Sequence, residues 1–367
     1  MNSLQQLQSA GQSIWLDFLR REMVTSGHLE WLRREDGVTG VTSNPTIFNK
    51  AISQGSDYDN AIHDLALAGH PEPHDIYYDL ALADVRMAAD VFRPVYEETG
   101  GRDGFVSFEL DPGLAHNTAG SVASARVLFS ELGRANTMIK VPGTTEGVRA
   151  VEQLTTVGVN VNITLLFSVQ MYKQVALAYI AGLEARHRAG QSLDRIASVA
   201  SFFVSRVDTA VDRQLAENSP IRGKVAIANS KLAYQQFRAI FSGDRWQALV
   251  KAGARPQRVL WASTGTKNPA YSDVLYVEEL VGPETVNTMP EKTLEAFRDH
   301  GRVRPTAVME RTDEAKTTLV HLASHGVSLD TVTGQLLEDG LKAFEADLEQ
   351  LLHVIEQNLV EVRAAVS

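Results

Sequence analysis

The chain has 367 residues and a formal net charge of -10, which argues against nucleic acid or an anionic membrane as a partner, since both attract an excess of Lys and Arg. It contains no cysteine, so disulfides, thiolate metal sites and a thiol nucleophile are excluded. No basic segment followed by an apolar run opens the sequence, and no apolar stretch reaches the length of a membrane span. The expected location is the cytoplasm.

Short apolar runs alternate with longer segments of helical periodicity, a pattern typical of βα units and a parallel sheet. Eight runs are predicted to be strands: Ser13–Phe18, Gly37–Thr42, Gly104–Leu110, Thr137–Val141, Asn160–Thr164, Ile196–Ser201, Arg258–Ser263 and Glu284–Thr288. Eight is the number of strands in an α/β barrel. The predicted fold is therefore a (β/α)8 TIM barrel with additional helices.

Helices are predicted between these strands. The connection from Pro45 to Gly101 is long and mostly helical, while residues 168–190 and 230–243 carry apolar residues at helical spacing and end on a glycine. No low-complexity segment or linker divides the sequence. The chain is expected to form a single α/β-barrel domain, residues 1–367.

Residues 337–359 are predicted to form a strongly amphipathic helix beyond the eighth strand. They belong to a C-terminal helical extension, from about residue 301 to 367, that is expected to pack on the barrel. The apolar face near Leu351, Val354 and Leu359 either covers the barrel or joins a partner chain in a homodimer.

Several predicted strands carry a polar residue near their C-terminal end. In "TMIKV", Lys140 points away from its neighbours Ile139 and Val141, because side chains alternate between the faces of a strand. Asp17, Glu109 and Asn162 lie on their strands in the same way. An α/β barrel collects its catalytic groups at the C-terminal ends of its strands, so these positions are candidates for an active site.

Lys140 is the candidate nucleophile of this group. Burial disfavours the charged form of a lysine, and the neutral amine attacks carbonyl carbons to give an iminium. Such chemistry requires proton carriers, for which Glu109 and Asp17 are candidates, and amides such as Asn44 and Asn162 could hold sugar hydroxyls. In the alternative interpretation Lys140 is structural and forms an ion pair with Glu109 at a strand end.

Six motifs carry a resemblance to a known family. "GVTGVTSNPTIF", "VSFELDP", "TMIKVPGTTEG", "GVNVNITLLFS", "ASFFVSRVD" and "VNTMP" follow one another in the order and spacing of transaldolase, the Schiff-base enzyme of the pentose phosphate pathway. The resemblance covers about residues 13–290. The chain length and the segment "WASTGTKNP" are similar to the longer bacterial subgroup. The resemblance implies an α/β barrel of the class I aldolase type.

The resemblance also implies a role for each matching residue. Lys140 matches the Schiff-base lysine, Asp17 the acid and base that acts at the C4 hydroxyl of the ketose, and Glu109 a carboxylate that works through a water molecule. Thr164 would hold that water. The substrate contacts are Asn44 and Asn162 for the dihydroxyacetone unit, Ser201 and Arg206 for a hydroxyl and the phosphate, Phe203 as an aromatic wall, and Ser263.

The expected phosphate end departs from the better-known family pattern. Where those relatives have a serine followed closely by an arginine, this chain has "STGTKNP", in which Lys267 is the only cation. Lysine binds phosphate as a point charge and lacks the bidentate fork of arginine. We expect Lys267 and Arg206 to hold the phosphate, although whether Lys267 replaces the second arginine is open at this point.

Simpler roles exist for three of these residues. Arg206 could pair with Asp208 or Asp212 on one helix face, Asn44 could open a turn before Pro45, and Phe203 could be a core residue. Each of these roles needs no substrate.

The predicted function is that of a transaldolase. It would transfer a dihydroxyacetone unit from sedoheptulose 7-phosphate or fructose 6-phosphate to glyceraldehyde 3-phosphate or erythrose 4-phosphate, with phosphorylated sugars as its partners. The alternatives are a class I aldolase of the fructose-6-phosphate type and a non-catalytic barrel that binds sugar phosphates. No cofactor is expected, and no metal, since the pair His321 and His325 lacks the glutamate of the zinc-protease helix.

Overall fold

The computed structural model describes residues 2–53, 55–68 and 72–366. Eight parallel strands form a closed barrel in which each strand pairs with its neighbours in the sequence and β8 pairs with β1. The strands are β1 (Gln12–Leu16), β2 (Gly40–Thr42), β3 (Val106–Glu109), β4 (Thr137–Pro142), β5 (Val161–Leu166), β6 (Ser198–Phe203), β7 (Arg258–Ala262) and β8 (Thr285–Met289). All eight predicted strands are confirmed, and their ends lie within three residues of the predicted ones.

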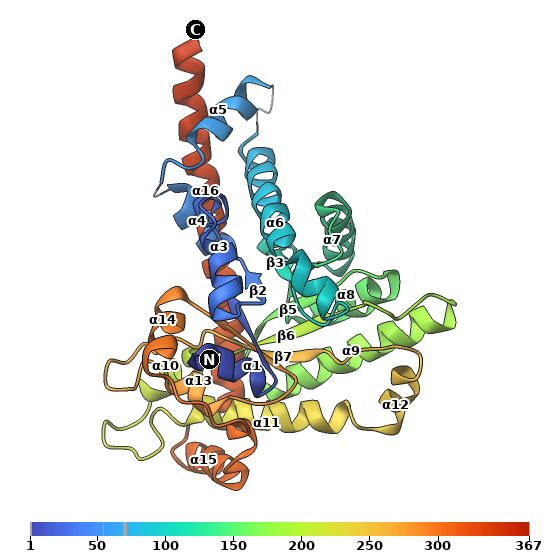
Figure 1. Ribbon diagram of the computed structural model, residues 1–367. Coiled ribbons are helices and arrows are strands. Elements are labelled where there is room, and N and C mark those ends of the chain that lie inside the picture. Colours follow the sequence, from blue (N-terminus) through green and yellow to red (C-terminus); the bar gives the residue numbers. More distant parts are fainter. Residues whose placement is uncertain (1, 54, 69–71, 367) are drawn as a thin grey trace.

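Helices surround the barrel and extend above it (Figure 1). Their bounds are α1 (Ser3–Ser9), α2 (Arg21–Thr25), α3 (His28–Trp31), α4 (Pro45–Ser53), α5 (Asp59–Leu67), α6 (Pro73–Glu98), α7 (Thr118–Leu132), α8 (Thr145–Val157), α9 (Val169–Arg188), α10 (Ser205–Asp212), α11 (Val225–Ile240), α12 (Asp244–Val250), α13 (Leu275–Glu279), α14 (Glu291–His300), α15 (Thr312–Ser324) and α16 (Leu329–Val366). The helices α4, α5 and α6 account for the long helical connection before β3. The predicted TIM barrel with additional helices is therefore the observed architecture.

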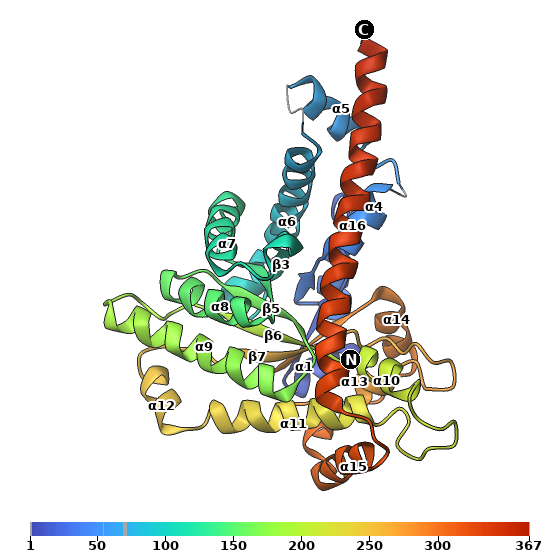
Figure 2. The same ribbon diagram turned by 180° about the vertical axis from the view of Figure 1, so that it is seen from behind.

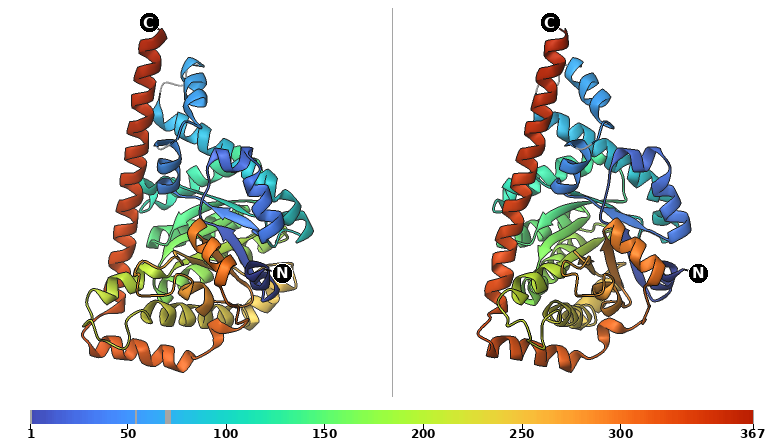
Figure 3. Two further views of the ribbon diagram at one scale, coloured as in Figure 1. Left: turned by 60° about the vertical axis from the view of Figure 1, so that its left-hand side comes forward. Right: turned by 90° about the vertical axis from the view of Figure 1, so that its left-hand side faces the viewer.

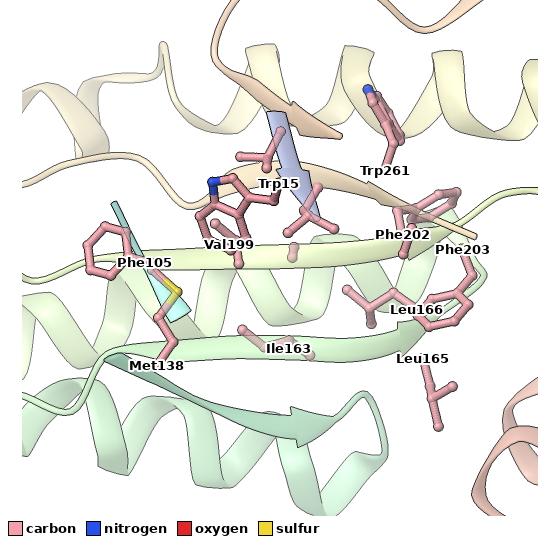
Figure 4. Close-up of a cluster of buried hydrophobic side chains, with 14 of the residues drawn as sticks. Trp15, Phe105, Met138, Ile163, Leu165, Leu166, Val199, Phe202, Phe203 and Trp261 are labelled. Carbon is pink, nitrogen blue, oxygen red and sulfur yellow. The ribbon is translucent and has the colours of Figure 1, made fainter. Parts of the chain in front are cut away.

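The barrel interior is filled by apolar side chains at the N-terminal ends of the strands. Trp15, Phe105 and Met138 gather there, whereas Phe203 lies at the opposite end of β6 (Figure 4). The indole N–H of Trp15 donates to Asp103 Oδ1 at 2.8 Å, which satisfies the polar edge of this buried ring. Beside this apolar layer a cavity of about 910 Å³ opens at the N-terminal ends of the strands, lined in part by Phe105, Met138 and Val199. A second cavity lies at the C-terminal ends, and most of the candidate catalytic residues line that one.

The helix α16 is the longest element and runs along one side of the molecule, past the C-terminal ends of the strands (Figures 2 and 3). Its apolar face packs on helices of the same chain, since α16 contacts α4, α5 and α6. Leu351, Ile355 and Leu359 are buried there, and Val354 is half-buried. None of the helices in the described ranges is long and apolar enough to cross a membrane.

Candidate active site

Lys140 points into the barrel from β4. Its Nζ donates to Glu109 Oε2 at 2.7 Å and to the backbone carbonyl of Ser43 at 2.9 Å. Only 5% of the Lys140 side chain and 3% of that of Glu109 are exposed. The prediction that this lysine faces inward is confirmed, and the ion pair with Glu109 is present as well. The contact with Glu109 follows from the register, in which the two residues are direct neighbours on β3 and β4.

Lys140 reaches a cavity of about 450 Å³ at the C-terminal ends of the strands. Nine of the eleven residues that the sequence nominates line this cavity: Asp17, Asn44, Lys140, Thr164, Ser201, Phe203, Arg206, Ser263 and Lys267. They come from six different strands or from the segments that directly follow them. Parallel strands in a closed barrel bring their ends together, which explains how residues 250 positions apart in the sequence meet.

Asp17 follows β1 and is held by Thr42, which in turn contacts Thr288. The hydroxyl of Thr42 donates to Asp17 Oδ1 at 2.7 Å and lies 2.7 Å from the hydroxyl of Thr288. Burial raises the pKa of the Asp17 carboxyl above its ordinary value, while the charge of Lys140 and the hydrogen bond from Thr42 oppose that rise. A carboxyl group in this setting can act as a base when ionised and as an acid once it has taken up a proton.

Glu109 and Thr164 each have one buried oxygen that is free. Glu109 Oε1 and Thr164 Oγ1 make no hydrogen bond to any described residue. Burial raises the pKa of Glu109, and the charge of Lys140 opposes this effect. Thr164 is the register partner of Pro142, two residues beyond Lys140 on β4. Two polar atoms on the strands next to Lys140 are thus free to bind water or substrate.

Asn162 and Glu109 are the two nominated residues that do not line the cavity. The amide of Asn162 is fully buried, donates to the hydroxyl of Ser107 at 3.0 Å, and accepts from that of Ser201 at 2.7 Å. Ser201 lines the cavity, so Asn162 supports the wall from behind.

Asn44 caps a helix and also lines the cavity. Its Oδ1 accepts from the backbone N–H of Ile47 at 3.0 Å, and so caps α4, as expected for an Asn before Pro45. The residue also lines the cavity, and its Nδ2 donates no hydrogen bond within the described part of the chain. The amide nitrogen therefore remains available for a ligand.

Arg206 lies in the first turn of α10, beside the cavity. Its guanidinium carbon is 5.2 Å from the ring centre of Phe203, a cation–π contact. Among the described residues no carboxylate forms an ion pair with Arg206. Asp208 accepts from Ala226 N and Tyr276 Oη, at 2.8 and 2.9 Å, and Asp212 from Gly223 N and Tyr271 Oη. The alternative in which Arg206 pairs with one of them is therefore wrong.

The cavity is lined by more cationic residues than the sequence analysis predicted. Lys50 of α4 and Lys292 of α14 line it together with Lys267. All three lysines are exposed, which places their charges at the mouth. A chain of net charge -10 thus concentrates cations where an anionic substrate would enter.

Strand ends at the site have unusual backbone conformations. Leu165 on β5 and Ser263 after β7 have φ values of 57° and 55°, in the left-handed region that costs non-glycine residues about 1 kcal/mol or more. Ser263 lines the cavity, and Leu165 directly follows Thr164, which also lines it. Such strain persists only where the surrounding structure imposes it.

Helix α16 closes one side of the cavity. Phe344 lines it, and the helix approaches Leu165 so closely that a Cβ added to Gly340 would lie 2.9 Å from Leu165 Cδ2. Asn49 on α4 donates to Gln350 Oε1 at 3.2 Å, which ties α4 and α16 together. A segment more than 150 residues from Lys140 in the sequence therefore contributes to the wall.

The sequence matches the model of the transaldolase/fructose-6-phosphate aldolase family over residues 14–355. The chain belongs to this family. Curated relatives resemble it along nearly all of their length. "Transaldolase 2" of Streptomyces avermitilis is 47% identical over 363 residues, which cover 98% of this chain and 97% of the relative. "Transaldolase" of Thermobifida fusca is 48% identical, covering 97% and 98%. "Transaldolase" of Trichodesmium erythraeum is 44% identical, covering 98% of each chain.

Several residues that line the cavity in this family protein were not nominated from the sequence, among them Thr42, Lys50, Lys292 and Phe344. Lys50 follows Thr46 by four positions on a predicted helix, a spacing that places both on one face. The sequence could therefore have indicated that Lys50 faces the site. No sequence pattern indicated that Phe344 lines the site, because its position depends on how α16 packs. As for metals, the described residues contain no cluster of three or more His, Cys, Asp or Glu side chains that could bind one.

We predict that Asp208 makes stability depend on pH. Burial raises the pKa of Asp208 from 3.8 to about 7. The folded state therefore holds a proton more tightly than the unfolded chain, and the free energy of unfolding should fall as the pH rises through this range. The shift corresponds to at most about 4 kcal/mol. Urea unfolding of the wild type and Asp208→Asn at pH 5, 6, 7 and 8 should show the variant gaining relative stability as the pH rises.

The control for this measurement is Asp313→Asn. It removes the same charge from a side chain that is 95% exposed and should show no such gain. A stability difference between wild type and Asp208→Asn that is constant across the four pH values would contradict the assignment.

Proposed function

We propose that the protein is a transaldolase, an enzyme that transfers a dihydroxyacetone unit between phosphorylated sugars through a Schiff base on Lys140. The donor would be fructose 6-phosphate or sedoheptulose 7-phosphate, and the acceptor glyceraldehyde 3-phosphate or erythrose 4-phosphate. The observation that carries the proposal is a buried lysine amine at the end of a cavity, 2.7 Å from one carboxylate, in a chain whose relatives are named transaldolases.

The first half of the reaction breaks the donor. The uncharged Nζ of Lys140 attacks the C2 carbonyl, and the resulting carbinolamine loses water to give an iminium. Glu109 would move the protons of this step through a water molecule bound to the free oxygens of Glu109 and Thr164. Asp17 then takes the proton of the C4 hydroxyl, the C3–C4 bond breaks, and the aldose phosphate leaves. The bonding electrons form an enamine on Lys140.

The second half reverses these steps with a new aldehyde. C3 of the enamine attacks the acceptor carbonyl, Asp17 returns its proton to the oxygen, and water hydrolyses the iminium to release the product and the free lysine. Asn44, with its unengaged Nδ2, and Asn162 would hold the dihydroxyacetone unit. Asn162 is buried behind Ser201, so its contact would require that hydrogen bond to be exchanged.

The phosphate would bind at the mouth of the cavity. Arg206, free of carboxylate partners in the described structure and resting on Phe203, supplies a fixed guanidinium, and Lys267 adds a point charge. Ser201 and Ser263, which line the same cavity, would contact substrate hydroxyls. Lys50 and Lys292 would attract the anionic sugar before it binds.

Three further assignments are part of the proposal. The barrel and residues 301–367 would form a single domain, because α16 lines the cavity through Phe344. The protein would work in the cytoplasm. The apolar face of α16 near Leu351 is buried within the chain, so this face is not available to a partner. A homodimer stays a prediction, which analytical ultracentrifugation would test.

Analysis of the products should separate the three possible functions. With fructose 6-phosphate and erythrose 4-phosphate, we expect sedoheptulose 7-phosphate and glyceraldehyde 3-phosphate, because the enamine waits for an acceptor. With fructose 6-phosphate alone, little free dihydroxyacetone should accumulate. Release of dihydroxyacetone at a comparable rate without the acceptor would indicate an aldolase, and no product in either reaction would indicate a non-catalytic binding protein.

The role of Asp17 can be tested with Asp17→Asn. The amide can still accept the hydrogen bond from Thr42, but it cannot take a proton, so kcat should fall by a factor of about 10² to 10⁴. In the wild type, kcat should fall as the pH drops through the raised pKa of Asp17, because only the ionised carboxylate is a base.

Thr42→Val is the matched variant. It keeps the base but removes the hydrogen bond that lowers the pKa of Asp17, so the acidic limb of the pH profile should move to higher pH. If Asp17→Asn retained kcat within a factor of about three, a value far below the effect of losing a general base, the assignment would be wrong.

A further inference from the structure

The segment between β7 and α13 that carries Lys267 is tied to α10 at two points. At its start, the N–H of Ser205 donates to the carbonyl of Ser263 at 3.0 Å, and the hydroxyls of these two serines lie 3.0 Å apart. At its end, the phenol of Tyr271 donates to Asp212 Oδ2 at 2.6 Å. Ser205 and Asp212 are the first and last residues of α10. The segment from Ser263 to Tyr271 therefore follows the whole helix, about 12 Å long.

The contact between Tyr271 and Asp212 is closely packed. Asp212 is 8% exposed, and its second oxygen accepts from the N–H of Gly223 at 3.2 Å. Gly223 has a φ of 67°, and a Cβ added there would lie 2.7 Å from Tyr271 Cζ. The backbone at Gly223 thus packs directly on the phenol ring. Burial, strengthened by the hydrogen bond to Asp212, raises the pKa of Tyr271 to about 12, so the phenol keeps its proton at neutral pH.

The same helix carries the other cation of the expected phosphate site. Arg206 directly follows Ser205, at the tied start of the segment. Lys267 lies between the two ties, is exposed, and forms no ion pair with any described residue. A lysine is a flexible point charge, so where its charge can reach depends on how firmly the backbone beneath it is held. Helix α10 therefore carries Arg206 and also anchors the segment that carries Lys267.

We propose that Tyr271 is a positioning residue whose bond to Asp212 holds Lys267 at the cavity mouth, where Lys267 and Arg206 together bind the phosphate group of the sugar. This inference rests on the proposed function and adds to it the contact that sets the preference for phosphorylated substrates. Tyr271 does not line the cavity and touches no substrate; it acts through Lys267.

The direct test is Tyr271→Phe, which removes one hydroxyl and keeps the ring. The KM for fructose 6-phosphate should rise about five- to tenfold, with kcat changed less than about twofold. This is less than the roughly 10- to 150-fold effect of a lost hydrogen bond to a charged group, because Tyr271 acts on the phosphate only through Lys267. The Kd for inorganic phosphate, measured by calorimetry on the unreacted protein, should rise by a similar factor. The concentration of unphosphorylated dihydroxyacetone needed to modify Lys140 should not change.

The matched control is Tyr276→Phe. Tyr276 of α13 also donates from its phenol to a carboxylate on α10, Asp208 Oδ2 at 2.9 Å, but it lies outside the tied segment. Its removal should leave the KM and the Kd for phosphate as in the wild type, even if the midpoint of thermal unfolding falls. Asp212→Asn, which weakens the same bond from the acceptor side, replaces Tyr271→Phe if that variant does not fold.

A double-mutant cycle with Lys267→Ala separates positioning from a general structural effect. Lys267→Ala should itself weaken phosphate binding, and adding Tyr271→Phe to it should change the Kd less than about twofold, because residues that act through one another are not additive. An unchanged Kd in Tyr271→Phe, or equal losses with and without Lys267, would overturn the proposal. Because phosphate binding needs no turnover, absence of sugar transfer in the wild type would count against the proposed function alone.

Discussion

The ion pair between Lys140 and Glu109 is the contact around which the barrel interior is arranged. Two charges removed from water lose several kcal/mol of hydration each, and their attraction offsets this only with good geometry and further hydrogen bonds. Here the pair is 2.7 Å apart, and Lys140 also meets the carbonyl of Ser43. Glu109 Oε1 is left without a described partner. The pair is thus held firmly through Oε2, while Oε1 of the same carboxylate is free to bind water or substrate.

Much of this arrangement follows from the period-two pattern of the strands. The eight strands, the inward direction of Lys140 and its place in one cavity with Asp17 could all be predicted, because a closed parallel barrel fixes which residues share an end. Two interpretations of Lys140, an ion pair or a nucleophile, looked exclusive in the sequence but are compatible in space. For Asn44 likewise, capping α4 and facing the cavity are compatible.

The remaining parts depend on packing between distant segments. Phe344 lines the cavity because α16 lies against Leu165. The local sequence around either residue does not predict this contact. The burial of Asn162 behind Ser201 depends on which side-chain hydrogen bonds form across the barrel. The alternative in which Arg206 pairs with Asp208 or Asp212 fails because both carboxylates accept from backbone N–H groups and phenols instead. Strand periodicity predicts which face a residue is on, whereas partners across elements come only from the fold.

The central claim is that Lys140 forms the covalent intermediate, and borohydride reduction in the presence of fructose 6-phosphate tests it most directly. Peptide mapping by mass spectrometry should find a reduced three-carbon adduct on Lys140 alone, and Lys140→Arg, a folded control that keeps the charge beside Glu109, should carry none. An adduct on a different lysine, or no adduct in an active wild-type protein, would contradict the account.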